Sequence, residues 1–558
     1  MPARFHFELR RLPFASAGRH AAHQCLARRH EEVPLGRELL PRGASREEEI
    51  MSRKSRLAFQ LVARLLFVLN VYLAAPHLSF AQSLPLAPLP ATVFAQDARK
   101  KLLPEQASAQ PSAAPASSAD QATGDAADPS DSVTVFPHSN ISRYWISGQG
   151  NVVLQWHGAF PAKYSGQNSL TNWAQSATTH VLTLYTGYEL THTTEVFADL
   201  EDATGSGIGN ANGMAGYTNL DSVRIADGVA LSRAPYLARF MLRQIIPLSH
   251  DSVEADRDEL HLATLLPARR LEFRVGKFDT VDFFDVNTWG SDSHLQFLNW
   301  TVDSNGAYDY AANTRGYTDG AMLEYVDHWW TARFAEVMMP KTANGRFLDA
   351  DIARARAENL ELEARGRRVA HRPGTVRLLT YLNHADMGNY EEAIADFLKG
   401  KTATPDIIAT RVQGRHKYGF GLNVEQSITP QVGVFGRLGW SDGRNESYAY
   451  TEDDRTAEVG GMANGSLWRR RDDRAGVAFV ANGIVAAHQE YLALGGLGFI
   501  LGDGGLTYGH EKIVEAFYTA HLWRGFYASY DFQHANNPGY NQARGPAAVS
   551  AVRFHTDF

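Results

Sequence analysis

The sequence predicts an all-β fold, an antiparallel β-barrel that crosses a membrane, and three observations lead to this prediction. From about residue 133 onward, short segments alternate apolar and polar side chains with a period of two, and turn residues separate them. The chain is rich in Gly, Tyr and Phe, with 47, 22 and 28 of these among 558 residues, yet its mean hydropathy is −0.30. No segment after residue 81 has the run of about 18 apolar residues that a spanning helix needs, so a membrane location would require a closed barrel.

Residues 51–81 have the pattern of a secretory signal peptide. Basic residues follow Met51, an apolar core covers residues 65–75, and small residues at 79 and 81 offer a cleavage site before Gln82. The alternative is a membrane anchor, but Arg64 and Asn70 limit the apolar run. We therefore expect export and cleavage.

Three further segments complete the expected organisation. Residues 1–50 lack a strand or clear helix period, and we interpret them as an extension that comes from a misplaced start codon. Residues 82–132 are rich in Ala, Pro and Ser and are expected to form a disordered linker. The barrel domain is expected to span residues 133–558.

Two pairs of segments show the alternation most clearly. Residues 418–424 and 432–440 form one pair around a short turn, and residues 516–522 and 526–532 form another. In each segment one face is mostly apolar and the other is polar, small or charged, as in a barrel that has lipid on one side and water on the other. A soluble sandwich would give the same alternation. Long polar connections at Ser441–Arg474 and Asp279–Arg315 favour the barrel, with long extracellular loops.

The last strand ends on the last residue of the chain. Residues 548, 550, 552, 554, 556 and 558 share one face of this strand, which closes with Phe558. A terminal Phe on an amphipathic strand resembles the signal that the bacterial barrel-assembly machinery reads. We therefore expect Phe558 to be an assembly signal.

Specific motifs resemble the OprB-type carbohydrate-selective porin family over most of residues 140–558. The closing segment Gln533–Phe558 looks like that family's Asn-Pro-Gly-Tyr-Asn ending, and Leu271–Asn287 and Gln296–Gly316 resemble further family motifs. The resemblance implies a barrel of about 16 strands in the outer membrane of a Gram-negative bacterium, an even strand number being usual there. It also implies passive diffusion of monosaccharides and similar small carbohydrates.

Charged residues on the strands should face the water-filled interior, because a charge on the lipid side costs about 2–4 kcal/mol at midplane. In the segment 236–245, Tyr236, Ala238 and Phe240 would lie on the lipid face, with Leu237 on the other. By this argument, the pore-lining candidates are Arg239, Arg243, Arg274, Glu425, Arg437, Glu515, Asp531 and Arg553. They could contact solutes, or they could form ion pairs that support the wall.

The connection Asp279–Arg315 is a candidate loop that folds inward and narrows the pore. It carries polar and aromatic side chains suited to a constriction, namely Asp282, Asp285, Asn287, Trp289 and Trp300. The alternative is an ordinary extracellular loop.

The sequence favours a channel over other classes of function. A general or anion-leaning diffusion porin is the alternative within transport, given the inward arginines. We find no nucleophile–base pair for an enzyme, no surface domain for an adhesin, and no metal or cofactor site; the one cysteine, Cys25, lies upstream of the signal. The net charge of −7 and the lack of a basic stripe argue against nucleic acid. Expected partners are small sugars, outer-membrane lipid and lipopolysaccharide, the assembly machinery and, as an option, two further copies in a homotrimer.

Overall fold

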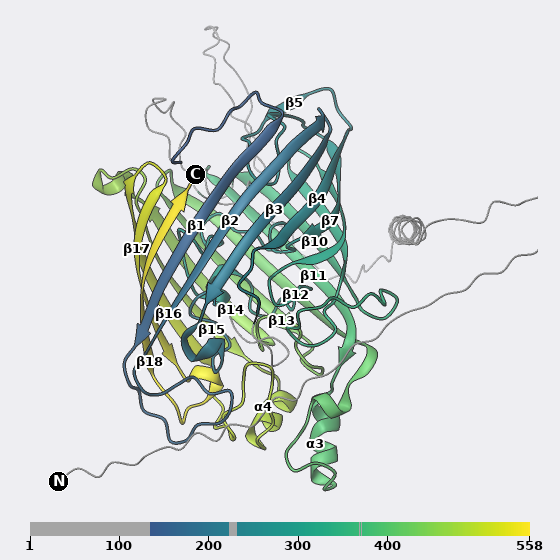
Figure 1. Ribbon diagram of the computed structural model, residues 1–558, viewed down its shortest axis with the longest axis vertical. Helices are drawn as coiled ribbons and strands as arrows, with labels where there is room; N and C mark the ends of the chain where they lie inside the picture. Colours follow the sequence, from purple (N-terminus) through teal and green to yellow (C-terminus); the bar gives the residue numbers. More distant parts are fainter. Residues whose placement is uncertain (1–133, 223–230, 368, 370) are drawn as a thin grey trace, which may run out of the picture. The chain divides into compact units, whose positions relative to one another are not determined.

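The computed structural model describes residues 134–222, 231–367, 369 and 371–558, and within these residues sixteen antiparallel strands close into one barrel (Figure 1). In chain order the barrel strands are β1 (Tyr144–His157), β2 (Gln175–Thr191), β3 (Thr194–Gly205), β4 (Tyr236–Pro247), β7 (Arg270–Phe278), β8 (Thr318–Val326), β9 (Trp330–Met338), β10 (Arg356–Arg367), β11 (Pro373–Met387), β12 (Val412–Thr429), β13 (Val432–Ser441), β14 (Arg455–Asn464), β15 (Arg474–Gly483), β16 (Glu511–Trp523), β17 (Phe526–Asn536) and β18 (Ala547–Asp557). The predicted fold class and strand number are confirmed.

The barrel closes where β1 pairs with β18, as Figure 1 shows for the first and last strands of the colour scale. At the end of this seam, the Gly148 amide donates to the Phe558 carbonyl at 2.7 Å, and the Phe558 amide donates to the Gly148 carbonyl at 2.8 Å. A Cβ on Gly148 would lie 2.6 Å from the Phe558 ring, so only glycine lets the ring pack there. The terminal residue is thus part of the seam.

The strands present their apolar side chains outward and their polar side chains inward. On β12 and β13, Phe420 and Leu438 are exposed, whereas Asn423 and Arg437 on the opposite faces are buried. β16, β17 and β18 alternate in the same way. The predicted faces of these strands are confirmed, and the alternation follows from the pleat of the strand.

The connections differ strongly in length between the two ends of the barrel. At one end, which we call the turn end, they are short, as at residues 192–193, 327–329, 430–431 and 524–525. At the other, the loop end, they are long, as at residues 206–235, 279–317, 388–411 and 484–510.

Short helices lie in several of the long connections. α2 (Trp300–Asp303) is in the connection from β7 to β8, α3 (Tyr390–Leu398) follows β11, and α4 (Ala486–Ala493) follows β15. 3₁₀ turns cover Ile208–Ala211, Ile408–Thr410, Gly465–Trp468 and Pro538–Tyr540. Within the described part of the chain, none of these helices has the length and apolar character that a membrane crossing requires.

One turn-end connection is longer than the others and carries its own hairpin. It joins β4 to β7 and contains β5 (Ser252–Glu254) and β6 (Leu265–Pro267), which pair only with each other.

One predicted connection is wrong. The stretch Ser441–Arg474 contains a barrel strand, β14, which pairs with β13 and β15. Its inward residues include Thr456 and Glu458, but its outward face carries Ala457, Val459 and Gly461, and the small residues leave little apolar contrast. Gly and Ala are weak strand formers, so the period of two was not visible in the sequence.

A β-bulge corrects the predicted faces at the start of β4. The register between β3 and β4 shifts so that Asp199 pairs with Arg239 while Leu200 pairs with Leu237. The extra residue exchanges the two faces on either side of it. Leu237 is 43% exposed on the outer face, and Tyr236 points inward. The predictions for Tyr236 and Leu237 were therefore wrong, whereas Arg239 lies on the inner face.

The expected extension (1–50), signal peptide (51–81) and linker (82–132) lie outside the described residues.

Candidate functional site

The connection 279–317 lies inside the barrel. It contacts inward-facing side chains on strands that are far apart around the wall. Tyr381 on β11 donates its hydroxyl proton to the Ala307 carbonyl at 2.7 Å. Thr519 on β16 donates to the Leu295 carbonyl at 2.8 Å. The loop therefore crosses the interior between these two parts of the wall.

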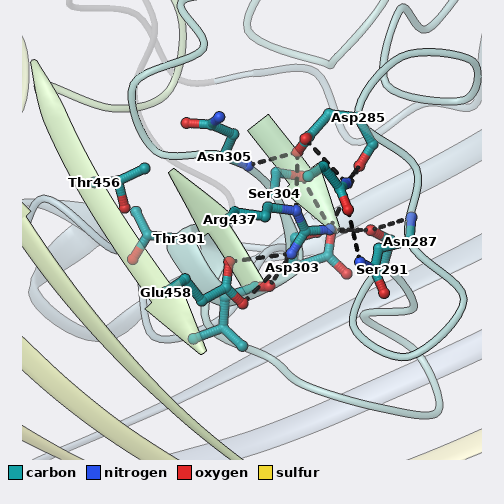
Figure 2. Close-up of polar contacts among 12 residues, drawn as sticks. Asp285, Asn287, Ser291, Thr301, Asp303, Ser304, Asn305, Arg437, Thr456 and Glu458 are labelled. Atoms are coloured by element: carbon teal, nitrogen blue, oxygen red, sulfur yellow. Dashed lines mark hydrogen bonds and ion pairs between the residues drawn. The ribbon is translucent and has the colours of Figure 1, made fainter. Parts of the chain in front are cut away.

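Arg437 on β13 binds the middle of this loop, as Figure 2 shows. Its guanidinium group lies 3.1 Å from carboxylate oxygens of both Asp285, on the loop, and Glu458, on β14. It also donates to the carbonyls of Val302 and Asp303, at 2.9 and 3.0 Å. With 1% of its surface exposed, Arg437 connects the loop to the wall.

Two more inward side chains hold the loop backbone from the other side. Glu515 on β16 accepts hydrogen bonds from the amides of Leu298, at 2.5 Å, and Asn299, at 3.2 Å. Arg553 on β18 donates to the Gln296 carbonyl at 2.9 Å. Charge-assisted hydrogen bonds of this kind are stronger than neutral ones. The loop is therefore fixed along residues 285–303.

A belt of ion pairs runs along the inner wall from β3 to β12. Arg243 lies 2.8 Å from both Glu195 and Glu272, and Arg274 lies 2.6 Å from Glu272 and 2.9 Å from Glu324. The belt continues through Arg333, Glu361, Glu363, Arg377 and Glu425. Its charges are paired and buried, so the belt supports the wall.

The β4–β7 connection also reaches the interior, from the turn end. Glu195 accepts hydrogen bonds from the amides of Leu262 and Ala263, at 3.1 and 2.9 Å. Leu262 is buried in the same apolar cluster as Phe197 of β3. Glu259, close by in sequence, lines the cavity described next.

A cavity of about 330 Å³ lies between the loop 279–317 and strands β1 to β4. One part of its lining is aromatic. The Trp300 ring stacks on Tyr450 at 4.7 Å between centroids and 13° between planes, and Tyr310 stacks on Tyr450 at 5.5 Å and 6°. The three rings come from the loop and from the β13–β14 connection, so that two loop-end connections build this surface together.

A carboxylate with hydroxyl partners forms a second part of the lining. Glu201 on β3 accepts hydrogen bonds from the hydroxyls of Tyr236, Tyr317 (3.0 Å) and Thr183 (3.1 Å). The Arg315 guanidinium lies 3.8 Å above the Tyr236 ring. Polar acceptors and aromatic faces therefore lie next to each other.

A histidine pair forms a third part. His294 of the loop lies 3.3 Å from Asp221 and stacks on His555 of β18 at 5.6 Å. Burial favours the neutral imidazole, but the Asp221 carboxylate outweighs it and raises the pKa of His294 to about 9. His294 is therefore protonated near pH 7.

Four of the candidates from the sequence line this cavity, namely Arg239, Asp282, Asp285 and Trp300. Two other loop candidates do not. Asn287 is buried and donates to Asn423 on β12 at 2.8 Å. Trp289 packs against Gly433 on β13, where a Cβ would lie 1.9 Å from the indole ring.

The other wall candidates lie inward but away from this cavity. They hold the loop or support the wall: Arg243, Arg274, Glu425, Arg437, Glu515, Asp531 and Arg553. For Arg437, Glu515 and Arg553 the geometry matches a supporting role. Sequence reasoning missed much of the cavity lining, including Glu201, Asp221, Tyr236, His294, Tyr317 and Tyr450. In the sequence, these residues share no motif; they have in common that they lie near strand ends or in long connections.

The chain resembles solved structures in fold. The high-pH structure of Pseudomonas putida OprB aligns with a TM-score of 0.56 and 13% identity, over 74% of this chain and 94% of that chain. The low-pH structure of the same protein aligns with a TM-score of 0.40 and 10% identity, over 74% and 92%. The channel DcaP of Acinetobacter baumannii aligns with a TM-score of 0.40 and 9% identity, over 74% and 97%. No curated protein matches the sequence.

The family to which the chain belongs follows from its sequence. The profile described as "Carbohydrate-selective porin, OprB family" matches residues 167–558, well over half of the chain, including the loop, the cavity lining on β3 and β4, and the closing strand. The resemblance seen in the motifs is thereby confirmed. The chain belongs to the carbohydrate-selective porin, OprB family, and is a carbohydrate channel of the outer membrane.

Proposed function

We propose that this porin passes monosaccharide-sized sugars by passive diffusion, and that the cavity beside the loop 279–317 is the narrow part of their route. The observation that carries the proposal is the composition of this cavity. It combines stacked rings, a hydroxyl-bonded carboxylate and a loop fixed inside the barrel.

The size of the cavity supports small solutes. Pockets for small molecules span about 300–1,000 Å³. A cavity of about 330 Å³ is at the lower end of this range, which suits one pyranose ring better than an oligosaccharide.

The chemistry of the lining also fits a sugar. A carboxylate can accept hydrogen bonds from sugar hydroxyls and replace part of their hydration. An aromatic ring can cover the C–H face of a pyranose, as the Tyr450 and Trp300 rings would if a sugar lay against them. Asp282, whose side chain is partly exposed, would offer a further acceptor from the loop.

Swelling of proteoliposomes with sugars of increasing size tests the proposal. Glucose should enter quickly, and the rate should fall steeply for a disaccharide and a trisaccharide. Equal rates for all small solutes would leave a general porin, and absence of glucose entry through a folded barrel would refute the proposal.

The substitution Trp300→Ala tests the cavity itself. It removes the ring that stacks on Tyr450, so we expect the ratio of glucose uptake to that of an amino acid of similar mass to fall. Trp329→Ala is the matched control, because Trp329 is 69% exposed in the β8–β9 turn. Equal ratios in the two variants would place the narrow part of the route elsewhere.

We further propose that residues 51–81 are a cleaved signal, with 1–50 an upstream extension and 82–132 a linker, and that no catalytic reaction takes place in the barrel. The long loops would then be extracellular and the turn end periplasmic. The barrel-assembly machinery would read Phe558, and the barrel would sit among lipid and lipopolysaccharide, alone or as a homotrimer. N-terminal sequencing of the mature protein tests the signal, because a start before Gln82 would contradict it.

A further inference from the structure

We propose that the β14–β15 turn, residues 465–473, binds the phosphate group of an anionic glycerophospholipid at the surface of the membrane. The turn lies at the turn end of the barrel, and short turns face the periplasm in bacterial outer-membrane barrels. The lipid leaflet on that side consists of glycerophospholipids. The proposal rests on the outer-membrane location of the family and does not involve the route of the sugar.

The first observation is a run of three exposed arginines in this turn, Arg469, Arg470 and Arg471. Arg470 is used by the fold, because it donates to the Asp473 carboxylate at 3.1 Å and to the His521 carbonyl at 2.8 Å. The other acid of the turn, Asp472, lies 3.5 Å from the His521 ring. Among the residues that the structure describes, Arg469 and Arg471 have no carboxylate partner. Their guanidinium groups are therefore available to an anion from outside the chain.

The neighbouring β16–β17 turn adds a further cation, Arg524, which is also exposed. It lies 4.9 Å from the centre of the Trp523 ring and donates to the Val135 carbonyl at 3.4 Å. Arg470 and Asp473 join the two turns, since the Asp473 carboxylate accepts a hydrogen bond from the His521 amide at 2.9 Å. Together the two turns carry four arginines against two aspartates, so their surface has a positive excess.

The second observation is the set of aromatic and apolar side chains beside these arginines. The Trp468 indole donates to the Tyr518 hydroxyl at 3.2 Å, and Tyr518 is exposed on the outer face of β16. Leu467 and Trp523 are exposed as well. Tryptophan and tyrosine gather where the hydrocarbon of a membrane meets the lipid headgroups. The arginines next to them therefore lie at the depth of the lipid phosphates.

The chemistry of the two groups fits. A guanidinium group can donate two parallel hydrogen bonds to the oxygens of one phosphate. A zwitterionic lipid brings its own ammonium group, which offsets part of this attraction, so an anionic lipid is favoured. An acidic soluble protein could also meet the positive charge, but the exposed Leu467 and Trp523 favour a partner that has acyl chains.

Native mass spectrometry of the channel, purified from membranes in a nonionic detergent, tests the proposal. Phosphatidylglycerol and phosphatidylcholine with the same acyl chains are the probes. We expect phosphatidylglycerol to bind at least about fivefold more tightly, because one arginine near an anionic lipid surface contributes about this factor. The preference should shrink as the salt concentration rises. Equal binding of the two lipids at low salt would overturn the proposal.

The double variant Arg469→Gln/Arg471→Gln tests the position of the site. It should weaken the binding of phosphatidylglycerol by roughly tenfold to thirtyfold and leave that of phosphatidylcholine unchanged. Arg354→Gln/Arg444→Gln is the matched control, because it removes the same charge from two exposed arginines at the loop end. A preference that persists in the turn variant, or that the control loses equally, would overturn the proposal.

A single variant, Arg469→Gly, decides the matter if the double variant fails to fold. Arg469 has a φ of 68°, in the left-handed region that glycine adopts more easily than arginine. The glycine should therefore keep the shape of the turn and remove one charge, with about fivefold weaker binding of phosphatidylglycerol. Unchanged binding would contradict the proposal. Glucose uptake should be the same in all these variants as in the unmodified channel, so the proposed sugar route and the lipid site can fail independently.

Discussion

Replacement of Arg437 by Met should open the channel. The arginine connects Asp285 on the loop to Glu458 on the wall, at 3.1 Å each, and also donates to the carbonyls of Val302 and Asp303. Met has similar length but leaves two buried carboxylates without their cation. Loss of one partner of a buried ion pair costs about 3–5 kcal/mol.

That cost falls mainly on the contact between loop and wall. A loss of about 3 kcal/mol lowers the ratio of seated to displaced loop by more than about a hundredfold. We therefore expect higher single-channel conductance in Arg437→Met and measurable uptake of a trisaccharide. The double variant Arg437→Met/Glu458→Gln removes the wall carboxylate as well and should recover part of the closed state.

Arg243→Met is the matched control. Arg243 is 2% exposed and also lies between two carboxylates, Glu195 and Glu272, but both of these belong to the wall. The control should lower the free energy of unfolding with little change in conductance. If Arg437→Met lowers stability as Arg243→Met does and leaves conductance unchanged, the loop does not narrow the pore.

Three further predictions concern charge and packing. Burial raises the pKa of Asp303 to about 7, so its carboxyl group loses its proton as the pH rises past that value. The K⁺/Cl⁻ permeability ratio of the channel should therefore increase between about pH 6 and pH 8, and Asp303→Asn should reduce the increase. Gly433→Ala should displace the Trp289 ring and lower the free energy of unfolding by about 1–3 kcal/mol. The tryptophan fluorescence spectrum should shift, and an unchanged spectrum would contradict the packing of Trp289 on Gly433. Phe558→Ala removes the ring that packs on Gly148 and should lower the free energy of unfolding by roughly 1–2 kcal/mol. Urea titration of the refolded barrel measures this change, and equal stability of the two proteins would show that the ring adds nothing to the seam.

The strands could largely be predicted because most of them show the alternation of apolar and polar residues within their own sequence. On β12 and β18 the apolar and polar residues alternate without interruption, and a pleated strand converts this alternation directly into two faces. β14 was missed because its outward residues are mostly Ala and Gly, which give no apolar contrast. Strand prediction from one sequence therefore fails where the lipid face is built from small side chains.

The cavity could be predicted only in part, because its residues come from separate segments that meet through tertiary structure. Asp282, Asp285 and Trp300 were found because they share one long connection. Glu201 and Tyr450 lie far apart in the chain and have no common pattern. Tyr236 was assigned to the wrong face because of the bulge between β3 and β4. A bulge depends on the register between two neighbouring strands, and the sequence of one strand alone does not give that register.

The inward-facing charged residues show a further limit, because the sequence predicts their face but not what they bind. Alternation and the cost of charge in lipid predict an inward position for Arg437 and Arg553, and both side chains are buried. What these two residues do there depends on the loop, because the carbonyls that accept their hydrogen bonds belong to loop residues between 285 and 303. An arginine that donates several hydrogen bonds to the chain has few donors left for a solute. The inward arginines that bond to the loop should therefore matter more for the position of the loop than for direct contact with a solute.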